Sequence, residues 1–349
     1  MTKNYFKLKA KLKKFWLMYM FIMIMILSTM IMISSMSWLN AWMGMEINLM
    51  SFIPLMLNKS SMKISNSMMI YFIIQASSSS ILLIMIIFMK MKFDINKMSI
   101  VLMFIQMSLM MKLGVAPLHW WLPKVLMNLN WMNCFIILTW QKVGPLFMLM
   151  NSNNNMLIYL MALISNYMGA IQGMNQSSIK MILNYSSVNH LGWMLMTMIL
   201  NMKLLMFYLL IYFFINLSVC MIMNNLDSTY INQLFKNNNQ NMNIKIILIS
   251  MFLSMAGLPP MLGFLPKILS LMVMIKNKMI MESIMFIIAS TISLSFYINP
   301  LMSMLIFAKN NNKWTNKNNN LMKSLMTKIF LINMLMNSMI IGPLMNNLM

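Results

Sequence analysis

The sequence has no arginine, and among its 349 positions it has only two cysteines, two histidines and four acidic residues. An iron–sulfur cluster needs about four thiolates at close spacing, so the isolated Cys134 and Cys220 hold none. His119 and His190 stand on different segments and are too few for a metal or haem site. No G-x-G-x-x-G fingerprint follows a strand, and no loop is long enough for a nucleotide-binding domain. We therefore expect no cofactor in this chain.

Charged residues are also scarce. They make up 9% of the chain, whereas 60% of the residues are hydrophobic. Soluble domains carry about 25% charged residues, which argues against a water-soluble globule. Apolar runs follow one another along most of the sequence, and a membrane-spanning helix needs about 20 such residues. Composition therefore predicts an all-α polytopic membrane protein in contact with the lipid bilayer.

The basic residues are all lysine, and the formal net charge is +22 at pH 7. Such a charge could indicate a nucleic-acid partner, but the lysines lie mostly in short connections, which is a pattern of membrane topology. A basic segment, 1–14, precedes the first apolar run. No small-residue cleavage site follows that run, so we expect a retained helix and not a signal peptide. The lysine distribution favours an N-terminus on the inner side.

Segment length and flanking polarity predict about eleven spans. These are residues 15–33, 36–57, 66–89, 97–127, 131–150, 156–174, 179–200, 203–223, 243–275, 282–307 and 321–345.

Two of these spans are too long for a single crossing. As straight helices, 97–127 and 243–275 would each exceed ~45 Å, against a hydrocarbon core of ~30 Å. Both are interrupted by helix breakers: Gly114, Pro117 and Pro123 in the first, and Gly257, Pro259, Pro260, Gly263 and Pro266 in the second. Because backbone groups freed by a break need protein or water partners, we expect both helices to be broken and to line polar cavities.

The two broken helices are the fourth and the ninth in the predicted order. Residues 15–150 and 156–307 would then be two five-helix repeats of opposite topology, followed by a final helix at 321–345. Paired broken helices in inverted repeats point to a transport site.

Four charges lie inside apolar segments: Glu46, Lys112, Lys142 and Lys267. A charge at the bilayer centre costs roughly 2.5–3.5 kcal/mol, so these residues predict a functional site. We expect Glu46 to pair with Lys112, since mutual stabilisation needs an opposite charge within ~4–6 Å. The alternative for the lysines is snorkelling to the interface. A desolvated lysine can release its proton whereas arginine cannot, which favours a proton path.

Both histidines are weaker candidates for the same path. His119 follows the first break, and its alternative role is a hydrogen bond to a carbonyl freed by Pro123. His190 lies on the segment 179–200, which has no predicted break.

Four motifs lie around these residues, KLGVAPLHWWLP (112–123), LTWQKVGP (138–145), NYSSVNHLGW (184–193) and GLPPMLGFLPK (257–267). Together with WMGME at 42–46 they resemble the antiporter-like membrane subunits of mitochondrial NADH:ubiquinone oxidoreductase (respiratory complex I), in particular the subunit 2 family. The resemblance covers nearly the whole chain. It implies proton translocation in the mitochondrial inner membrane, with the N-terminus on the matrix side and other membrane-arm subunits as partners.

The resemblance also implies residue roles. Glu46 and Lys112 would form the first-half pair, Lys142 the central relay lysine and Lys267 the second broken-helix lysine, with His119 and His190 as further relay residues. Two positions depart from the family pattern: Lys124 stands where the family has an acid, and Lys180 stands without a second basic neighbour. The alternatives are a stand-alone cation/proton antiporter and a structural membrane subunit whose charges merely pair.

Overall fold

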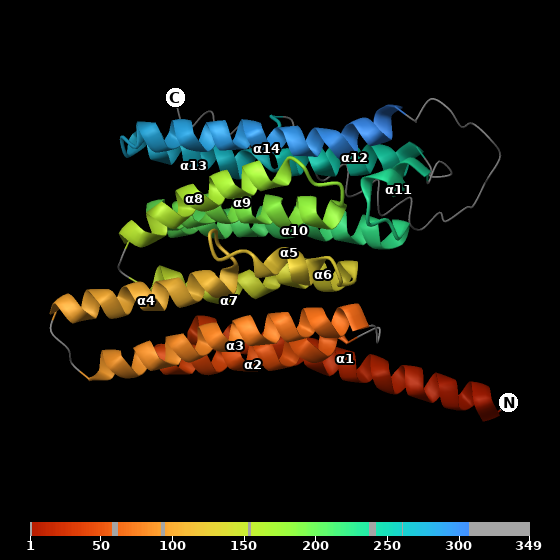
Figure 1. Ribbon diagram of the computed structural model, residues 1–349, viewed down its shortest axis with the longest axis horizontal. Coiled ribbons are helices and arrows are strands. Elements are labelled where there is room, and N and C mark those ends of the chain that lie inside the picture. Colours follow the sequence, from red (N-terminus) through yellow and green to blue (C-terminus); the bar gives the residue numbers. More distant parts are fainter. Residues whose placement is uncertain are drawn as a thin grey trace. The chain divides into compact units, whose positions relative to one another are not determined.

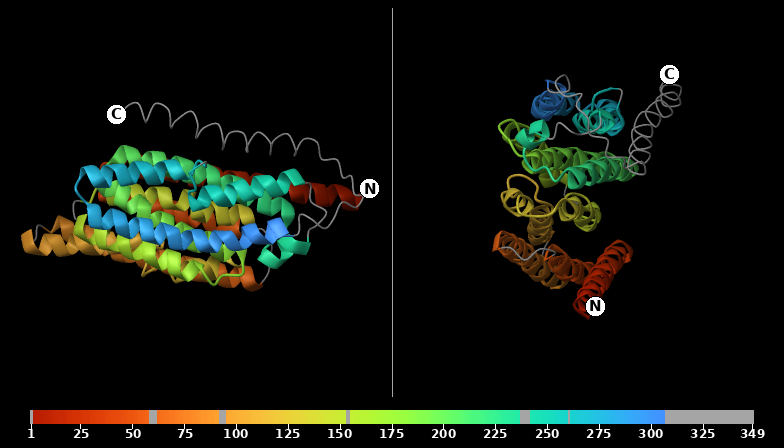
Figure 2. Two further views of the ribbon diagram at one scale, coloured as in Figure 1. Left: turned by 90° about the horizontal axis from the view of Figure 1, so that it is seen from above. Right: turned by 90° about the vertical axis from the view of Figure 1, so that its right-hand side faces the viewer.

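The computed structural model describes residues 2–57, 62–91, 95–152, 155–236, 242–259 and 261–306. Its regular elements are α-helices (Figure 1), and by contacts the chain divides into two compact units. The first unit comprises 1–114 and 118–157, and the second comprises 115–117 and 158–349. Within each unit the axes of the long helices are roughly aligned, since one view of Figure 2 shows them lengthwise and the other nearly end-on.

The first unit is built on α1 to α7. These helices are α1 (Thr2–Ser34), α2 (Trp38–Met56), α3 (Met62–Lys90), α4 (Ile95–Leu113), α5 (Trp121–Leu126), α6 (Trp131–Leu138) and α7 (Trp140–Met150). The hydroxyl of Ser37 accepts a hydrogen bond from the Asn40 N–H and so caps the start of α2. The Trp42 indole then ties α2 to α3 by donating to the Ser79 carbonyl, 3.1 Å away. α7 packs against α1, α2 and α4.

The second unit is built on α8 to α14. These helices are α8 (Asn155–Gly173), α9 (Ile179–Leu200), α10 (Met202–Leu226), α11 (Ile231–Lys236), α12 (Met242–Ala256), α13 (Phe264–Lys276) and α14 (Ile280–Ile306). α9 is buried along nearly its whole length and packs against α10, α13 and α14. Gly169 and Gly192 let α8 approach α9 closely, because a Cβ at either position would meet backbone atoms of the facing helix within 3.0 Å.

Helices occupy ten of the eleven predicted spans, and the eleventh, 321–345, lies outside the described residues. By length and composition, six described segments qualify as membrane-crossing helices: Trp16–Ser34, Met62–Lys90, Trp131–Met150, Met156–Gly173, Met202–Leu226 and Ile280–Met302. The chain is thus a multi-helix membrane protein. Residues 2–14 of the predicted basic segment belong to the same helix as the first apolar run.

Both predicted helix breaks are confirmed. The segment 97–127 divides into α4 and α5, and the segment 243–275 divides into α12 and α13. Gly114 and Gly257, directly after α4 and α12, have φ of +70° and +82°, a conformation that glycine adopts without a Cβ clash. The sequence did not predict a third break, at Thr139, which separates α6 from α7 with φ −122° and ψ −70°.

The second break also brings two stretches of backbone into contact at Gly263. A Cβ at this position would overlap the carbonyl oxygen of Ser254 on α12. The chain after the break can therefore fold back onto α12 only because residue 263 has no side chain.

We predict that Gly263→Ala destabilises the protein by roughly 1–3 kcal/mol, the usual cost of overpacking. Gly144→Ala is the matched control, because its Cβ would meet only the flexible end of the Met32 side chain. The check is the midpoint of thermal unfolding in detergent, and equal midpoints for the two variants would contradict the close backbone contact.

Candidate functional site

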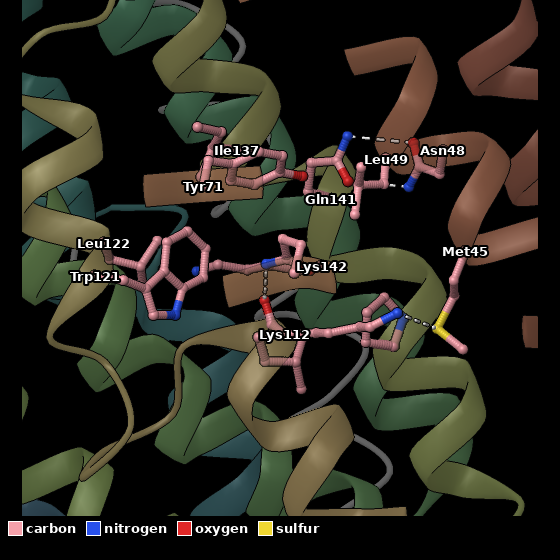
Figure 3. Close-up of a pocket in the computed structure, with 13 residues that line it drawn as sticks. Met45, Asn48, Leu49, Tyr71, Lys112, Trp121, Leu122, Ile137, Gln141 and Lys142 are labelled. Carbon is pink, nitrogen blue, oxygen red and sulfur yellow. Dashed lines mark hydrogen bonds between the residues drawn. The ribbon is translucent and has the colours of Figure 1, made fainter. Parts of the chain in front are cut away.

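Lys112 and Lys142 border one small cavity inside the first unit (Figure 3). Lys112 comes from the end of α4 and Lys142 from α7, so the fold brings together two lysines that lie on different predicted spans. The cavity has a volume of about 20 Å³. A water molecule needs about 10–15 Å³ by this measure and two to four polar partners. The cavity therefore has room for a water between side chains that can exchange protons.

Lys112 is buried, with 7% of its surface exposed, and its ammonium donates to the Met45 thioether at 3.7 Å. Its own carbonyl, freed by the end of α4, accepts a hydrogen bond from the Gln75 amide at 3.2 Å. The preceding carbonyl, of Met111, accepts one from the Trp121 indole at 3.2 Å. Neighbouring side chains thus donate hydrogen bonds to both carbonyls at the end of the broken helix. The Lys112 side chain is not needed for this and instead lines the cavity.

The predicted contact between Glu46 and Lys112 is not a direct ion pair. Both residues are described, and Lys112 meets the sulfur of Met45 while Glu46 is only half-buried on the same helix. The Glu46 charge still acts on the Lys112 ammonium at longer range. No direct ion pair forms because adjacent residues of α2 lie about 100° apart around the helix axis. Met45 and not Glu46 therefore lies against Lys112.

Among the lysines whose side chains the structure describes, Lys142 is the most deeply buried, with 2% exposed. It lies in the first turn of α7, directly after the break at Thr139. Its neighbour Gln141 exchanges two hydrogen bonds with Asn48 of α2, at 3.0 Å and 3.2 Å (Figure 3). This amide pair joins the helix of Glu46 to the helix of Lys142.

Lys267 lies in the second unit and has a different environment. It is 6% exposed, and its ammonium donates to the Ala256 carbonyl, 2.9 Å away. That carbonyl is the last of α12, directly before the break at Gly257. Lys267 therefore caps the broken helix with its own charge, at the end where a helix favours a cation.

Each histidine is buried, one in each unit. His119 lies between α4 and α5, within the motif that follows the first break. His190 lies on α9, and its Nδ1 is 2.8 Å from the hydroxyl of Tyr208 on α10. The structure thus places Lys112, Lys142 and His119 in the first unit and Lys267 and His190 in the second.

The two departures from the family motifs differ in exposure. Lys124 is exposed, with its ammonium 5.1 Å from the centre of the Trp120 ring, a cation–π contact. Lys180 is buried in the first turn of α9. Sequence reasoning missed Gln75, Asn48 and Tyr208, because single amides and tyrosines in apolar helices show no pattern that marks them.

Metal ligation has no support in the described part of the chain. No group of three or more histidine, cysteine, aspartate or glutamate side chains there is arranged to hold a metal ion. Cys134 and Cys220 are buried and form no disulfide.

Comparison with known proteins gives consistent matches. The family profile described as "NADH:quinone oxidoreductase/Mrp antiporter, TM" matches residues 35–293. The chain is 39% identical over 309 residues to NADH-ubiquinone oxidoreductase chain 2 of Anopheles gambiae, covering 86% of this chain and 89% of that protein. It is 36% identical over 299 residues to the Locusta migratoria protein of the same name, covering 84% and 87%.

The fold is also found among solved structures. A chain of respiratory complex I from Thermus thermophilus superposes with a TM-score of 0.81, covering 92% of this chain and 78% of that one, at 18% identity. At that identity the likeness is one of fold. The family profile and the relatives agree, and the chain belongs to the NADH:quinone oxidoreductase/Mrp antiporter transmembrane family.

Proposed function

We infer that this chain is a proton-translocating subunit of the membrane arm of respiratory complex I. The observation that carries the inference is the identity of 36–39%, over more than four-fifths of both chains, to proteins named NADH-ubiquinone oxidoreductase chain 2. NADH oxidation and ubiquinone reduction take place elsewhere in the complex, and this chain uses the energy to move protons. It holds no redox cofactor of its own.

The site of translocation is the set of buried lysines with Glu46. Lys112 and Lys142 border one cavity that has room for a water, and such a water would carry a proton between them. Lysine suits this role because it can release and regain its proton, whereas arginine keeps its proton. The candidate relay residues of the second unit are Lys267 and His190, and His119 lies beside the first break.

Glu46 controls the first lysine at a distance. Its charge attracts the Lys112 ammonium, although no direct ion pair joins the two side chains. A change in the position or charge of Glu46 would therefore change the affinity of Lys112 for its proton. In this mechanism energy from the redox reaction reaches the lysines through that coupling.

The remaining assignments concern topology and surroundings. The chain has eleven spans, with two five-helix repeats of opposite topology at 15–150 and 156–307 and a final helix at 321–345. It lies in the mitochondrial inner membrane with the N-terminus on the matrix side, which the lysine-rich inner connections support. Its partners are the other membrane-arm subunits and lipid, and nucleic acid is not among them.

A stand-alone cation/proton antiporter is the second reading, since the same family includes Mrp antiporters. The two functions differ in what the chain assembles with. We expect the chain to co-purify from membranes with flavin- and iron–sulfur-containing subunits in one large complex. Recovery as an isolated protein whose transport responds to sodium would favour the antiporter.

We predict that Lys142→Arg assembles into the complex but slows proton pumping, roughly 100-fold or more, because positioned proton-transfer groups contribute about 10²–10⁴ in rate. Lys142→Met should lose coupled activity as well, since it carries no proton. The measurements are quinone-linked NADH oxidation and proton pumping in membranes that contain equal amounts of complex. Lys124→Arg and Lys124→Met are the controls, because Lys124 is exposed over Trp120. Normal rates in both Lys142 variants would make Lys142 a structural charge.

We predict that Glu46→Gln reduces pumping because Lys112 loses the charge that acts on it. The loss of stability should be smaller than the roughly 3–5 kcal/mol seen when a direct buried partner is removed, since no ion pair is broken. Adding Lys112→Met should restore stability without restoring pumping. Glu282→Gln is the control, because Glu282 instead accepts a hydrogen bond from Tyr159, 2.7 Å away. Normal pumping by assembled Glu46→Gln would remove Glu46 from the mechanism.

A further inference from the structure

Three buried tyrosines of the second unit direct their hydroxyl groups at α9. They come from α10 and α14 and meet side chains within the motif NYSSVNHLGW. The hydrogen-bonded pairs are Tyr297 with Ser186, Tyr212 with Ser187, and Tyr208 with His190.

The two serine pairs are structural. The Ser186 hydroxyl donates to the Leu183 carbonyl at 2.8 Å, and the Ser187 hydroxyl donates to the Asn184 carbonyl at 2.7 Å. A serine has a single hydroxyl proton, so in each pair the tyrosine is the donor. These contacts hold tyrosine rings against α9, and neither serine titrates.

The third pair differs because its partner is a titratable ring. The Tyr208 hydroxyl lies 2.8 Å from His190 Nδ1, and the two rings meet edge to face with centroids 6.0 Å apart. The Tyr212 ring lies on the same histidine at 5.2 Å. The imidazole is therefore packed by two tyrosines, of which one contacts a ring nitrogen.

A tyrosine hydroxyl is both a donor and an acceptor. It can accept a hydrogen bond from Nδ1–H of the neutral imidazole and still accept it when the ring becomes an imidazolium. The same contact thus persists through a complete cycle in which Nε2 takes up a proton and releases it. In both states Nδ1 keeps its hydrogen, and Nε2 is the basic nitrogen of the neutral ring.

We propose that Tyr208 is a positioning residue for proton transfer by His190: its hydroxyl holds Nδ1, fixes the orientation and tautomer of the ring, and directs proton exchange to Nε2. The proposal rests on the proposed role of His190 in the relay. The net change at the site is one proton gained and one released by the imidazole, with Tyr208 keeping its own.

The test is a double-mutant cycle between Tyr208→Phe and His190→Gln in the assembled complex. Tyr208→Phe removes one hydroxyl and keeps the ring. Tyr212→Phe is the matched control, since it removes a buried hydroxyl beside the same histidine but one that bonds to Asn216 and Ser187. NADH-driven proton pumping is the readout, and NADH oxidation with a water-soluble artificial acceptor measures the amount of assembled complex.

We expect Tyr208→Phe to lower pumping roughly two- to tenfold, the range in populations set by one lost hydrogen bond, and Tyr212→Phe to leave it unchanged. In the His190→Gln background Tyr208→Phe should have no further effect, which a merely structural tyrosine would not show. An equal loss in both backgrounds, or equal losses from both tyrosine variants, would overturn the proposal. Normal pumping by His190→Gln would overturn both the relay role of His190 and the positioning role of Tyr208. A pumping defect in His190→Gln together with normal pumping in Tyr208→Phe would overturn the positioning role alone.

Discussion

The arrangement of both buried sites depends on one requirement: a helix that stops inside hydrocarbon must have its freed carbonyl groups satisfied by protein or water. The two breaks meet this requirement in different ways. At the end of α4, Gln75 donates to the carbonyl of Lys112 and the Trp121 indole donates to that of Met111. At the end of α12, the ammonium of Lys267 donates to the carbonyl of Ala256.

Because of this difference, the side chains of Lys112 and Lys267 make different contacts. Because amide and indole groups cap the end of α4, the side chain of Lys112 can turn to a shared cavity with Lys142. Lys267 is the cap of its own break, so a change in its protonation changes how α12 ends. The groups that cap the break and the buried ammonium are thus separate in the first unit and are the same group in the second.

Uncharged polar side chains contact or lie next to the titratable groups. The pair Asn48–Gln141 joins the helix of Glu46 to that of Lys142 through two hydrogen bonds, and Tyr208 holds His190. Neutral partners suit a relay in a low-dielectric interior, because a permanent opposite charge would hold a proton on one residue and oppose its release.

Much of this protein could be predicted from the sequence, because hydrocarbon imposes strict local rules. Runs of apolar residues located the helices, and clusters of glycine and proline located the breaks at 114–120 and 257–263, since each effect acts within a few residues. Buried lysines in such runs marked the candidate site.

Tertiary structure alone decided which groups touch. It placed Met45 rather than Glu46 against Lys112, paired Asn48 with Gln141, and bent the chain at Thr139, where no proline or glycine stands. These outcomes depend on the rotation of each helix about its axis, and a turn of about 100° exchanges one residue for its neighbour. Packing against the other helices sets that rotation, so it is not encoded in any single segment.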